Sequence, residues 1–365
     1  MKSKLSVLII AVLFLGNHSF AQNKAAVQYH FVEASDLGII GKLMTDTPNP
    51  YHRVDTVKYK GFTETENIQV RSTSGLAVAF KTNSPSIHIK AKYGYKSYDT
   101  KTMGIALRGY DLYIRRGDSW LWANSACPRL DDEDSEFLLL GGMDKSVKEC
   151  LVYLPLYSEL YGLEFGVEKG CYIKPVENPF RHRIGIFGSS YTQGISAGRP
   201  GMTYPAQLAR HTGLQILSLG CSGNCKLQPY FADVLCDADV DAFIFDSFSN
   251  PTPEEMEDRL FPFIEKIQAA HPGIPLIFQQ TIYRERRNFN HDVDNSEQAK
   301  MYMADLLMQE ACRKYKDVYF IRPNATSPDH ETSVDGTHPS DEGYRIWAES
   351  IEQPVVDILF RYNIK

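Results

Sequence analysis

The chain has 365 residues, of which 43% are hydrophobic and 23% are charged, and its formal net charge is −6. This composition is typical of a soluble globular protein and excludes a collagenous, low-complexity or disordered chain. Basic residues form no dense run, so we expect no nucleic-acid partner, and the length favours two domains over one core.

The first residues have the pattern of an export signal. Lys2 and Lys4 form a short positive segment, Leu5 to Gly16 is apolar, and Ser19-Phe20-Ala21 offers small residues to a signal peptidase. Residues 1–21 are therefore predicted to be a signal peptide, and their apolar part is too short for a comfortable membrane span. We expect an exported protein, periplasmic or extracellular, without stable membrane insertion after cleavage.

Residues 22–180 are predicted to form an all-β sandwich of the jelly-roll-like kind. Alternating apolar segments are separated by turn residues about every ten positions, which is typical of antiparallel strands; examples are 76–80, 87–91 and 150–154. No convergent set of catalytic residue types occurs in this half. We interpret it as an accessory domain that binds a glycan, shapes the rim of a site in the other half, or supports the fold.

The sequence pattern changes at Asn178-Pro179-Phe180. After this point, residues 181–365 alternate apolar strands with amphipathic helices. Such alternation predicts a five-stranded parallel sheet covered by helices on both faces, a flavodoxin-like α/β/α sandwich. The expected strands are 183–187, 215–219, 242–246, 275–279 and 318–321, and the expected helices include 204–211, 254–270 and 299–314.

Seven cysteines match no zinc-binding spacing, and their odd number leaves at least one unpaired. They are Cys127, Cys150, Cys171, Cys221, Cys225, Cys236 and Cys312. An oxidising compartment would permit a bridge between Cys221 and Cys225. The default expectation is that all seven are small buried apolar residues.

A serine follows the first strand of the predicted parallel sheet. Gly188-Ser189-Ser190-Tyr191-Thr192-Gln193-Gly194 comes directly after an apolar run, so Ser190 is expected at the carboxyl edge, where open α/β folds build their sites. An ordinary Gly/Ser turn or a phosphate-binding loop is the alternative. Phosphate binding is the weaker of these two because no Lys-Ser or Lys-Thr follows the glycine.

Two further strand ends offer hydrogen-bond donors at the same edge. The second strand ends in Leu219-Gly220-Cys221-Ser222-Gly223-Asn224, where a glycine leaves its backbone N–H accessible to a bound acyl group. The third ends in Asp246-Ser247-Phe248-Ser249-Asn250-Pro251, where the Asn250 amide can serve the same oxyanion. Ser-Asn-Pro is equally typical of an ordinary turn, and neither segment is a specific signal on its own.

Asp335-Gly336-Thr337-His338 supplies an acid and an imidazole three residues apart. A histidine can accept the serine proton and return it to a leaving group, while a carboxylate fixes its tautomer. His338 could instead simply precede the last helix, and His291 with Asp292 or His330 with Asp329 stay open as alternatives.

Together these segments resemble the SGNH/GDSL hydrolase superfamily over about residues 181–365. The resemblance places the nucleophile at Ser190, in the Gly-Ser-Ser form of the first block, and the acid and base at Asp335 and His338. It implies an oxyanion hole formed by the Ser190 N–H, Gly223 and Asn250. Asn250 departs from the family pattern because Ser-Asn-Pro stands where Gly-x-Asn-Asp is usual.

Gly109-Tyr110-Asp111-Leu112-Tyr113 is similar to the Gly-x-Asp-Leu-Tyr signature of a β-domain that precedes SGNH esterases in many Bacteroidetes proteins. Arg199-Pro200-Gly201-Met202 adds to this two-domain resemblance. It implies an exported serine esterase that hydrolyses O-acyl esters, chiefly O-acetyl esters of carbohydrates, without metal or organic cofactor. A lipid-directed esterase or lysophospholipase, and a glycan-binding protein with an inactive hydrolase half, are the alternatives. The oligomeric state cannot be read from the sequence.

Overall fold

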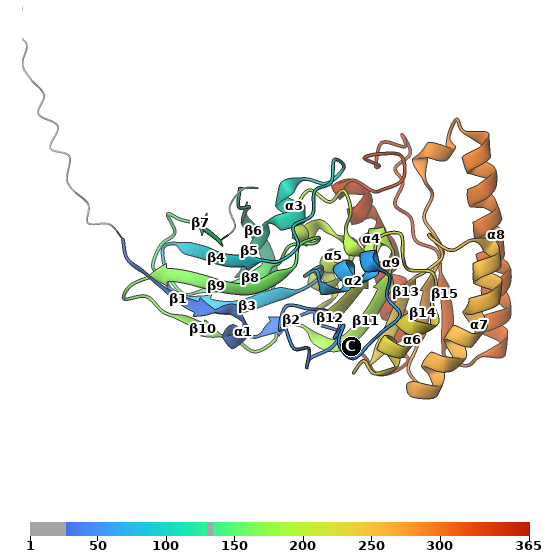
Figure 1. Cartoon of the computed structure of the whole chain (residues 1–365), viewed down its shortest axis with the longest axis horizontal. Coiled ribbons are helices and arrows are strands. Elements are labelled where there is room, and N and C mark those ends of the chain that lie inside the picture. Colours follow the sequence, from blue (N-terminus) through green and yellow to red (C-terminus); the bar gives the residue numbers. More distant parts are fainter. Residues whose placement is uncertain (1–26, 130–133) are drawn as a thin grey trace, which may run out of the picture.

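A computed structural model describes residues 27–129 and 134–365 of the chain, so the predicted signal peptide lies outside the described residues. Figure 1 shows an elongated molecule with the β-rich N-terminal half on the left and the α/β half on the right. Among the described residues no helix is both long and apolar enough to cross a membrane.

The N-terminal half forms two antiparallel sheets, which confirms the predicted β-sandwich. Within the described residues, one sheet has the strand order β1-β9-β4-β7, and the other has the order β10-β3-β8-β5-β6 with β2 paired to β3. The bounds are β1 (Tyr29–Glu33), β2 (Ile39–Ile40), β3 (Ala77–Thr82), β4 (Ile87–Tyr93), β5 (Tyr110–Arg116), β6 (Ser119–Ala126), β7 (Asp134–Leu140), β8 (Lys148–Tyr153), β9 (Leu160–Glu168) and β10 (Ile173–Pro175).

Part of the N-terminal half leaves the sandwich and packs against the parallel sheet. Residues 41–71 end in helix α2 (Glu64–Arg71), and Val54 is buried in one cluster with Leu217 of that sheet. Helix α2 was not predicted from the sequence. Its start has a capping box, in which Glu66 N donates to Thr63 Oγ1 and Thr63 N donates to the Glu66 carboxylate.

The α/β half contains the predicted flavodoxin-like sheet. Its five parallel strands have the order β12-β11-β13-β14-β15, in a region that the structure describes completely. The strands are β11 (Arg181–Gly188), β12 (Leu214–Gly220), β13 (Ala242–Asp246), β14 (Leu276–Gln279) and β15 (Val318–Ile321). Because β11 pairs with both β12 and β13, the carboxyl ends of these three strands lie side by side.

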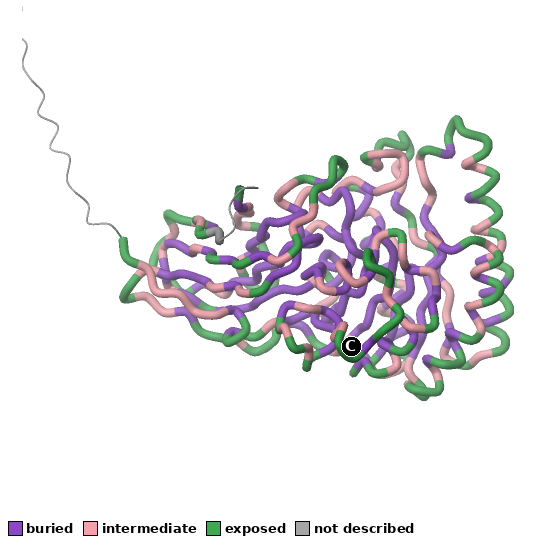
Figure 2. The backbone as a smooth tube through the Cα atoms, viewed as in Figure 1, coloured by how far each residue is buried: buried purple, intermediate pink, exposed green. Residues whose placement is uncertain are grey.

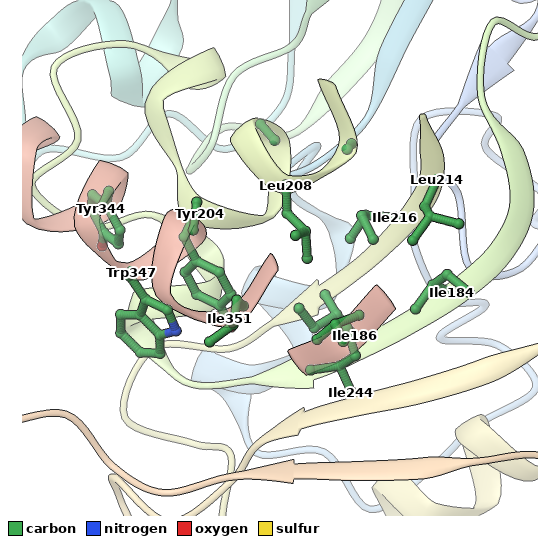
Figure 3. Packing of buried hydrophobic residues seen from close by; sticks show 14 of the residues in the cluster. Ile184, Ile186, Tyr204, Leu208, Leu214, Ile216, Ile244, Tyr344, Trp347 and Ile351 are labelled. Atoms are coloured by element: carbon green, nitrogen blue, oxygen red, sulfur yellow. The ribbon is translucent and has the colours of Figure 1, made fainter. Parts of the chain in front are cut away.

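Helices cover both faces of this sheet. One face packs against α5 (Tyr204–Thr212) and α9 (Asp341–Phe360). Figure 3 shows Ile184 and Ile186 of β11 in one cluster with Tyr204 of α5 and Trp347 of α9. The other face packs against α6 (Pro229–Cys236), α7 (Pro253–Ala270) and α8 (His291–Lys314). Shorter helices are α1 (Ala34–Leu37), α3 (Gly104–Arg108) and α4 (Ser190–Gln193), with 3-10 turns η1 (Pro200–Met202) and η2 (Glu285–Arg287).

Capping residues explain where two of these helices begin. Helix α7 starts at Pro253, one residue before the expected range 254–270, because Thr252 forms a capping box with Glu255. Helix α8 begins at His291, eight residues before the predicted start at 299. Asn290 caps it by accepting a hydrogen bond from Val293 N, and its first two turns are polar, so apolar spacing gives no signal there.

All seven cysteines are free thiols, so the structure contains no bridge between Cys221 and Cys225. Both of these side chains are buried, and Cys225 Sγ lies 3.2 Å from Ser247 Oγ. The default expectation of small buried residues holds for this pair. Cys312, by contrast, is exposed.

The two halves share a continuous hydrophobic core. Leu151 of β8 and Tyr113 of β5 belong to the same buried cluster as Ile186 of β11 and Leu208 of α5. Figure 2 shows the buried backbone running from the sandwich into the α/β half. The division of the chain at residue 180 into two domains stays a prediction.

A buried carboxylate joins the Gly-x-Asp-Leu-Tyr motif of the N-terminal half to the Arg-Pro-Gly-Met motif of the α/β half. Asp111, which is 0% exposed, accepts hydrogen bonds from Arg199 Nη1 at 2.7 Å, Gly201 N at 2.9 Å and Trp122 Nε1 at 2.9 Å. Arg199 also donates to the Tyr113 hydroxyl at 2.6 Å. The Gly-x-Asp-Leu-Tyr segment of one half therefore binds the Arg-Pro-Gly segment of the other.

We predict that Asp111→Ala lowers the free energy of unfolding by about 3 kcal/mol, because it removes the acceptor for Arg199 and leaves that cation partly buried without an acidic partner. Urea denaturation followed by circular dichroism measures the change. Asp118→Ala, in the exposed turn between β5 and β6, is the matched control and should change stability by less than about 0.5 kcal/mol. Equal stabilities for the two variants would contradict this role of Asp111.

Candidate active site

Ser190 lies where strand β11 turns into helix α4. It is the first residue of that helix and 8% exposed, and Ser189 caps the helix by accepting a hydrogen bond from Tyr191 N. Gly188 is required here because a Cβ at this position would collide with the hydroxyl of Thr192. The strand therefore ends in a tight turn that presents the Ser190 hydroxyl at the carboxyl edge of the sheet.

Asp246, the last residue of β13, holds this turn from the neighbouring strand. Its Oδ2 accepts hydrogen bonds from Ser189 N at 3.1 Å, Ser189 Oγ at 2.7 Å and Thr192 Oγ1 at 3.0 Å. Burial raises the pKa of Asp246 to about 6, although these donors and Ser249 oppose the rise. Above that pH the carboxylate is an anion surrounded by donors.

Ser190, His338 and Asp335 are brought into one line of hydrogen bonds. His338 Nε2 lies 3.2 Å from Ser190 Oγ, and His338 Nδ1 lies 2.9 Å from Asp335 Oδ2. An ionised carboxylate only accepts hydrogen bonds, so Nδ1 carries the proton and Nε2 is free to accept the serine hydrogen. This is the geometry that a serine nucleophile, its base and the orienting acid require.

The protonation states of this line suit base catalysis. Burial is the main cause that lowers the pKa of His338; Asp335 opposes the effect, and the charges of Lys101 and Arg284 add to it. Burial also acts to raise the pKa of Asp335. Hydrogen bonds from His338 and Thr337 outweigh burial and hold that pKa far below its usual value. At neutral pH the imidazole is therefore neutral and the carboxylate ionised.

The imidazole ring is also held by packing. The ring of Tyr191 meets that of His338 edge-on, with 5.7 Å between the ring centroids. Tyr191 is itself fixed, because Arg284 Nε donates to its hydroxyl at 2.8 Å and Trp347 packs against its ring. The residue after the serine thus fixes the orientation of the histidine.

Gly223 lies in an exposed turn directly after β12, with a φ of +73° that favours glycine. Residues from both halves hold this turn through Ser222. Ser222 N donates to Gln193 Oε1 at 2.8 Å, Gln69 Nε2 donates to Ser222 O at 2.9 Å, and the Tyr157 hydroxyl is 2.6 Å from Ser222 Oγ. Two of these three contacts come from the N-terminal half.

Asn250 follows β13 and offers a donor that the chain itself does not use. Its Nδ2 is buried and has no hydrogen-bond partner among the residues that the structure describes. A buried N–H without a partner costs about 1–3 kcal/mol, so an acceptor from outside the chain would relieve this cost. The preceding Ser249 is fixed, because its Oγ donates to Asp246 Oδ1 and its carbonyl accepts from Arg284 Nη2.

The alternative histidines lie in other surroundings. His330 Nδ1 is 2.6 Å from Glu285 Oε2, so His330 pairs with Glu285 rather than with Asp329. His291 is the exposed first residue of α8. Of the three candidates, the structure places only His338 within hydrogen-bond distance of Ser190.

Asp246 and Lys101 are among the residues that contact this site and were not predicted from the sequence. Asp246 had a local signal, since it is an acid that ends an apolar strand at the carboxyl edge of the sheet. Lys101 had none: it lies in the loop between β4 and α3 of the N-terminal half, and its Nζ is 3.0 Å from Asp335 Oδ2. In the described part of the chain, no three His, Cys, Asp or Glu side chains are grouped to hold a metal ion.

Sequence comparison matches both halves to described families. Residues 181–356 match the GDSL-like Lipase/Acylhydrolase family, and residues 27–173 match the GxDLY family, described as the N-terminus of Esterase_SGNH_hydro-type. A search of curated proteins found no match.

Comparison with solved structures finds the same two-part fold. A Bacteroides ovatus protein described as a GDSL-like lipase has a TM-score of 0.87 and 38% identity, covering 91% of this chain and 98% of that one. A salicylyl-acyltransferase from a tetracycline biosynthetic pathway has a TM-score of 0.68 and 20% identity. A family two carbohydrate esterase from Cellvibrio japonicus has a TM-score of 0.60 and 12% identity. The coverage is 91% of this chain and 98% of the other in both cases.

We predict that Asp246→Asn lowers kcat toward ester substrates by about 10²-fold with little change in KM. The amide replaces one acceptor oxygen with a donor that faces Ser189 or Ser249, so the nucleophile turn loses its geometry. Steady-state kinetics measure the effect. The control is Asp241→Asn, just before the amino end of the same strand, where the carboxylate accepts from Arg183 N. Equal kcat values for both variants would show that Asp246 does not position the turn.

Proposed function

Because this chain belongs to the GDSL-like lipase/acylhydrolase family of esterases, we propose that it hydrolyses short-chain O-acyl esters, chiefly O-acetyl esters, of carbohydrates. The catalytic residues of this proposal are Ser190, His338 and Asp335. The observation that carries it is the pair of contacts made by His338, one to the Ser190 hydroxyl and one to the Asp335 carboxylate.

In the first step of this proposal, Ser190 Oγ attacks the ester carbonyl carbon and His338 Nε2 takes its proton. Asp335 holds the imidazole by its Nδ1–H and stabilises the imidazolium that forms. The tetrahedral intermediate then expels the alcohol as the carbon–oxygen ester bond breaks. The imidazolium gives its proton to the leaving oxygen, which leaves an acyl group on Ser190.

In the second step a water molecule attacks the acyl-enzyme. His338 accepts a proton from the water and later returns it to Ser190 Oγ, so the products are one carboxylic acid and the free serine. The base must be neutral at the start of each step. The lowered pKa of His338 keeps it so at neutral pH.

The proposed oxyanion hole consists of the Ser190 N–H, the Gly223 N–H and the Asn250 amide. The unpartnered Nδ2 of Asn250 supports this assignment, because a negative oxygen in the site would satisfy it. Ser222, next to Gly223, is held by three hydrogen bonds. The Gly223 N–H is therefore oriented before substrate arrives. Preorganised donors of this kind supply most of the stabilisation in acyl transfer.

The residues around Ser190, His338 and Asp335 favour a short acyl group. Lys101 contacts Asp335, Arg286 Nη1 lies 3.4 Å from Thr337 Oγ1, and the Tyr157 hydroxyl contacts the turn that carries Gly223. A long acyl chain gains about 0.8 kcal/mol per buried CH₂ only against apolar walls. Polar and charged neighbours therefore favour acetyl over octanoyl esters.

A carbohydrate as the alcohol part is supported by two observations. Tyr98 is 68% exposed in the loop that carries Lys101, and an exposed aromatic ring offers a flat amphipathic surface to a sugar. Solved structures of the same fold include family two carbohydrate esterases from Cellvibrio japonicus and Clostridium thermocellum. This likeness concerns the fold alone. Acetylated carbohydrates are therefore the substrate class to test first.

We further propose that the protein is exported and acts in the periplasm or outside the cell. The support is the sequence of residues 1–21, with its basic start, apolar centre and small residues before the expected cleavage point. N-terminal sequencing of the protein secreted or exported by its host would identify the mature start.

We predict that the protein hydrolyses p-nitrophenyl acetate faster than butyrate or octanoate, and that it releases acetate from acetylated oligosaccharides. Ser190→Ala should lower kcat by on the order of 10⁶-fold, because the variant has no nucleophile. His338→Ala should lose activity similarly, whereas His330→Ala, the matched control, should retain it.

Each other outcome changes a defined part of the proposal. Full activity of Ser190→Ala would exclude the nucleophile, and loss of activity in His330→Ala alone would exclude His338 as the base. A preference for octanoate would replace the carbohydrate substrate with a lipid. Inactivity of the wild type on every ester would favour a glycan-binding protein.

A further inference from the structure

Lys101 connects the N-terminal half to the line of Ser190, His338 and Asp335. Its Nζ lies 3.0 Å from Asp335 Oδ2, the same oxygen that accepts from His338 Nδ1. The other oxygen, Asp335 Oδ1, accepts from the backbone N–H groups of Thr337 and His338. The carboxylate is therefore surrounded by donors, and among those from the described residues Lys101 is the one that comes from outside the 335–338 segment.

The loop that carries Lys101 is attached to the α/β half at the next residue. Thr102 is 6% exposed and accepts from Ser196 N at 2.9 Å, and Lys101 N donates to Asp99 Oδ1 at 2.6 Å within the loop. Ser196 lies just beyond α4 in the α/β half. This buried attachment places the backbone of Lys101 near Asp335, and the half-exposed Lys101 side chain spans the remaining distance.

The charges that face His338 come from three elements. Asp335 contacts its Nδ1 from within the same loop, Lys101 approaches from the N-terminal half, and Arg284 lies in the segment after β14, where it binds the hydroxyl of Tyr191. Arg284 is neutralised in part by Glu297 at 2.8 Å. The acid that Lys101 contacts is the same acid that must stabilise protonated His338.

We propose that Lys101 is a positioning residue of the proposed esterase, acting on His338 through Asp335. Two donors on Oδ2 restrict rotation of the carboxylate, and a cation there weakens its attraction for a second cation, the imidazolium. His338 consequently stays neutral to lower pH than it would with Asp335 alone. By this contact the N-terminal half becomes part of the catalytic apparatus, in addition to any role in binding sugars.

The effect has a defined sign. Removal of the Lys101 charge raises the pKa of His338, so the acid limb of the kcat/KM profile moves to higher pH and activity at mildly acidic pH falls. Because Lys101 is half-exposed, much of its field passes through water, and we expect a shift of about 0.5 pH unit. Salt should reduce the difference between wild type and variant for the same reason.

The test compares pH profiles of kcat/KM for p-nitrophenyl acetate in the wild type, Lys101→Met, Lys101→Arg and Lys58→Met. The wild-type acid limb should have its midpoint below 6.5, the ordinary value for histidine. Lys101→Met should move it upward, and Lys101→Arg should restore it. Lys58 is the matched control, because it also joins the two halves through an ion pair, with Asp237 at 2.8 Å, but has no contact with the 335–338 segment.

A second measurement separates this inference from the proposed function. An NMR titration of ¹³C-labelled histidine, with the His338 signal assigned by its loss in His338→Gln, gives the pKa of His338 without any substrate. The same upward shift in Lys101→Met supports the role of Lys101 even if the protein hydrolyses no ester. An active protein whose His338 pKa and acid limb are unchanged in Lys101→Met would overturn it, as would an equal shift in Lys58→Met.

Discussion

The site depends on the way the N-terminal half covers the edge strand β12 of the parallel sheet. Arg53 is 0% exposed, and its guanidinium donates to the carbonyls of Ser218 at 3.2 Å and Gly220 at 3.0 Å. A buried charge is tolerated only when its donors are satisfied, so the N-terminal half cannot shift along β12 without leaving Arg53 unpaired. Gly75 lies so close to Ser218 that a side chain there would collide with it. The edge that would otherwise expose unpaired backbone groups becomes a fixed internal boundary.

This boundary explains why residues of the N-terminal half reach the catalytic edge. Gln69 and Tyr157 hold the turn next to Gly223, and Lys101 contacts Asp335, so both the turn after β12 and the loop before α9 are supported from outside the α/β half. The buried contact of Asp111 with Arg199 and the shared hydrophobic core keep the two halves in this relation. The N-terminal half thus supports the fold of the α/β half and also contributes residues that contact the site.

Two carboxylates at the carboxyl edge have opposite electrostatic settings. Asp335 is partly exposed and its hydrogen bonds hold its pKa low, whereas Asp246 is fully buried and its pKa rises to about 6. The first is suited to stabilise a cationic imidazole. The second is suited to collect the hydroxyl and N–H donors of the turn that carries Ser190. The two residues are of the same type, so their different burial accounts for their different roles.

Periodicity predicted the parallel sheet well, and strand Ala242–Asp246 has the expected bounds, because buried parallel strands are continuous apolar runs. It failed where polar sequence forms helix, as at the start of α8, and where part of the N-terminal half packs outside its sandwich. The candidate triad lay within reach of sequence analysis because each member follows a strand or shares a short loop. The contact of Lys101 with Asp335 joins residues far apart in the chain and has no local pattern.

The most direct measurement of the central claim, that Ser190 is a nucleophile activated by His338, is reaction with a fluorophosphonate, followed by peptide mapping and by the pH dependence of the rate. One adduct, on Ser190, at a rate that falls as His338 becomes protonated, is the predicted result. An adduct on another residue, or none in a protein that hydrolyses esters, would contradict the account.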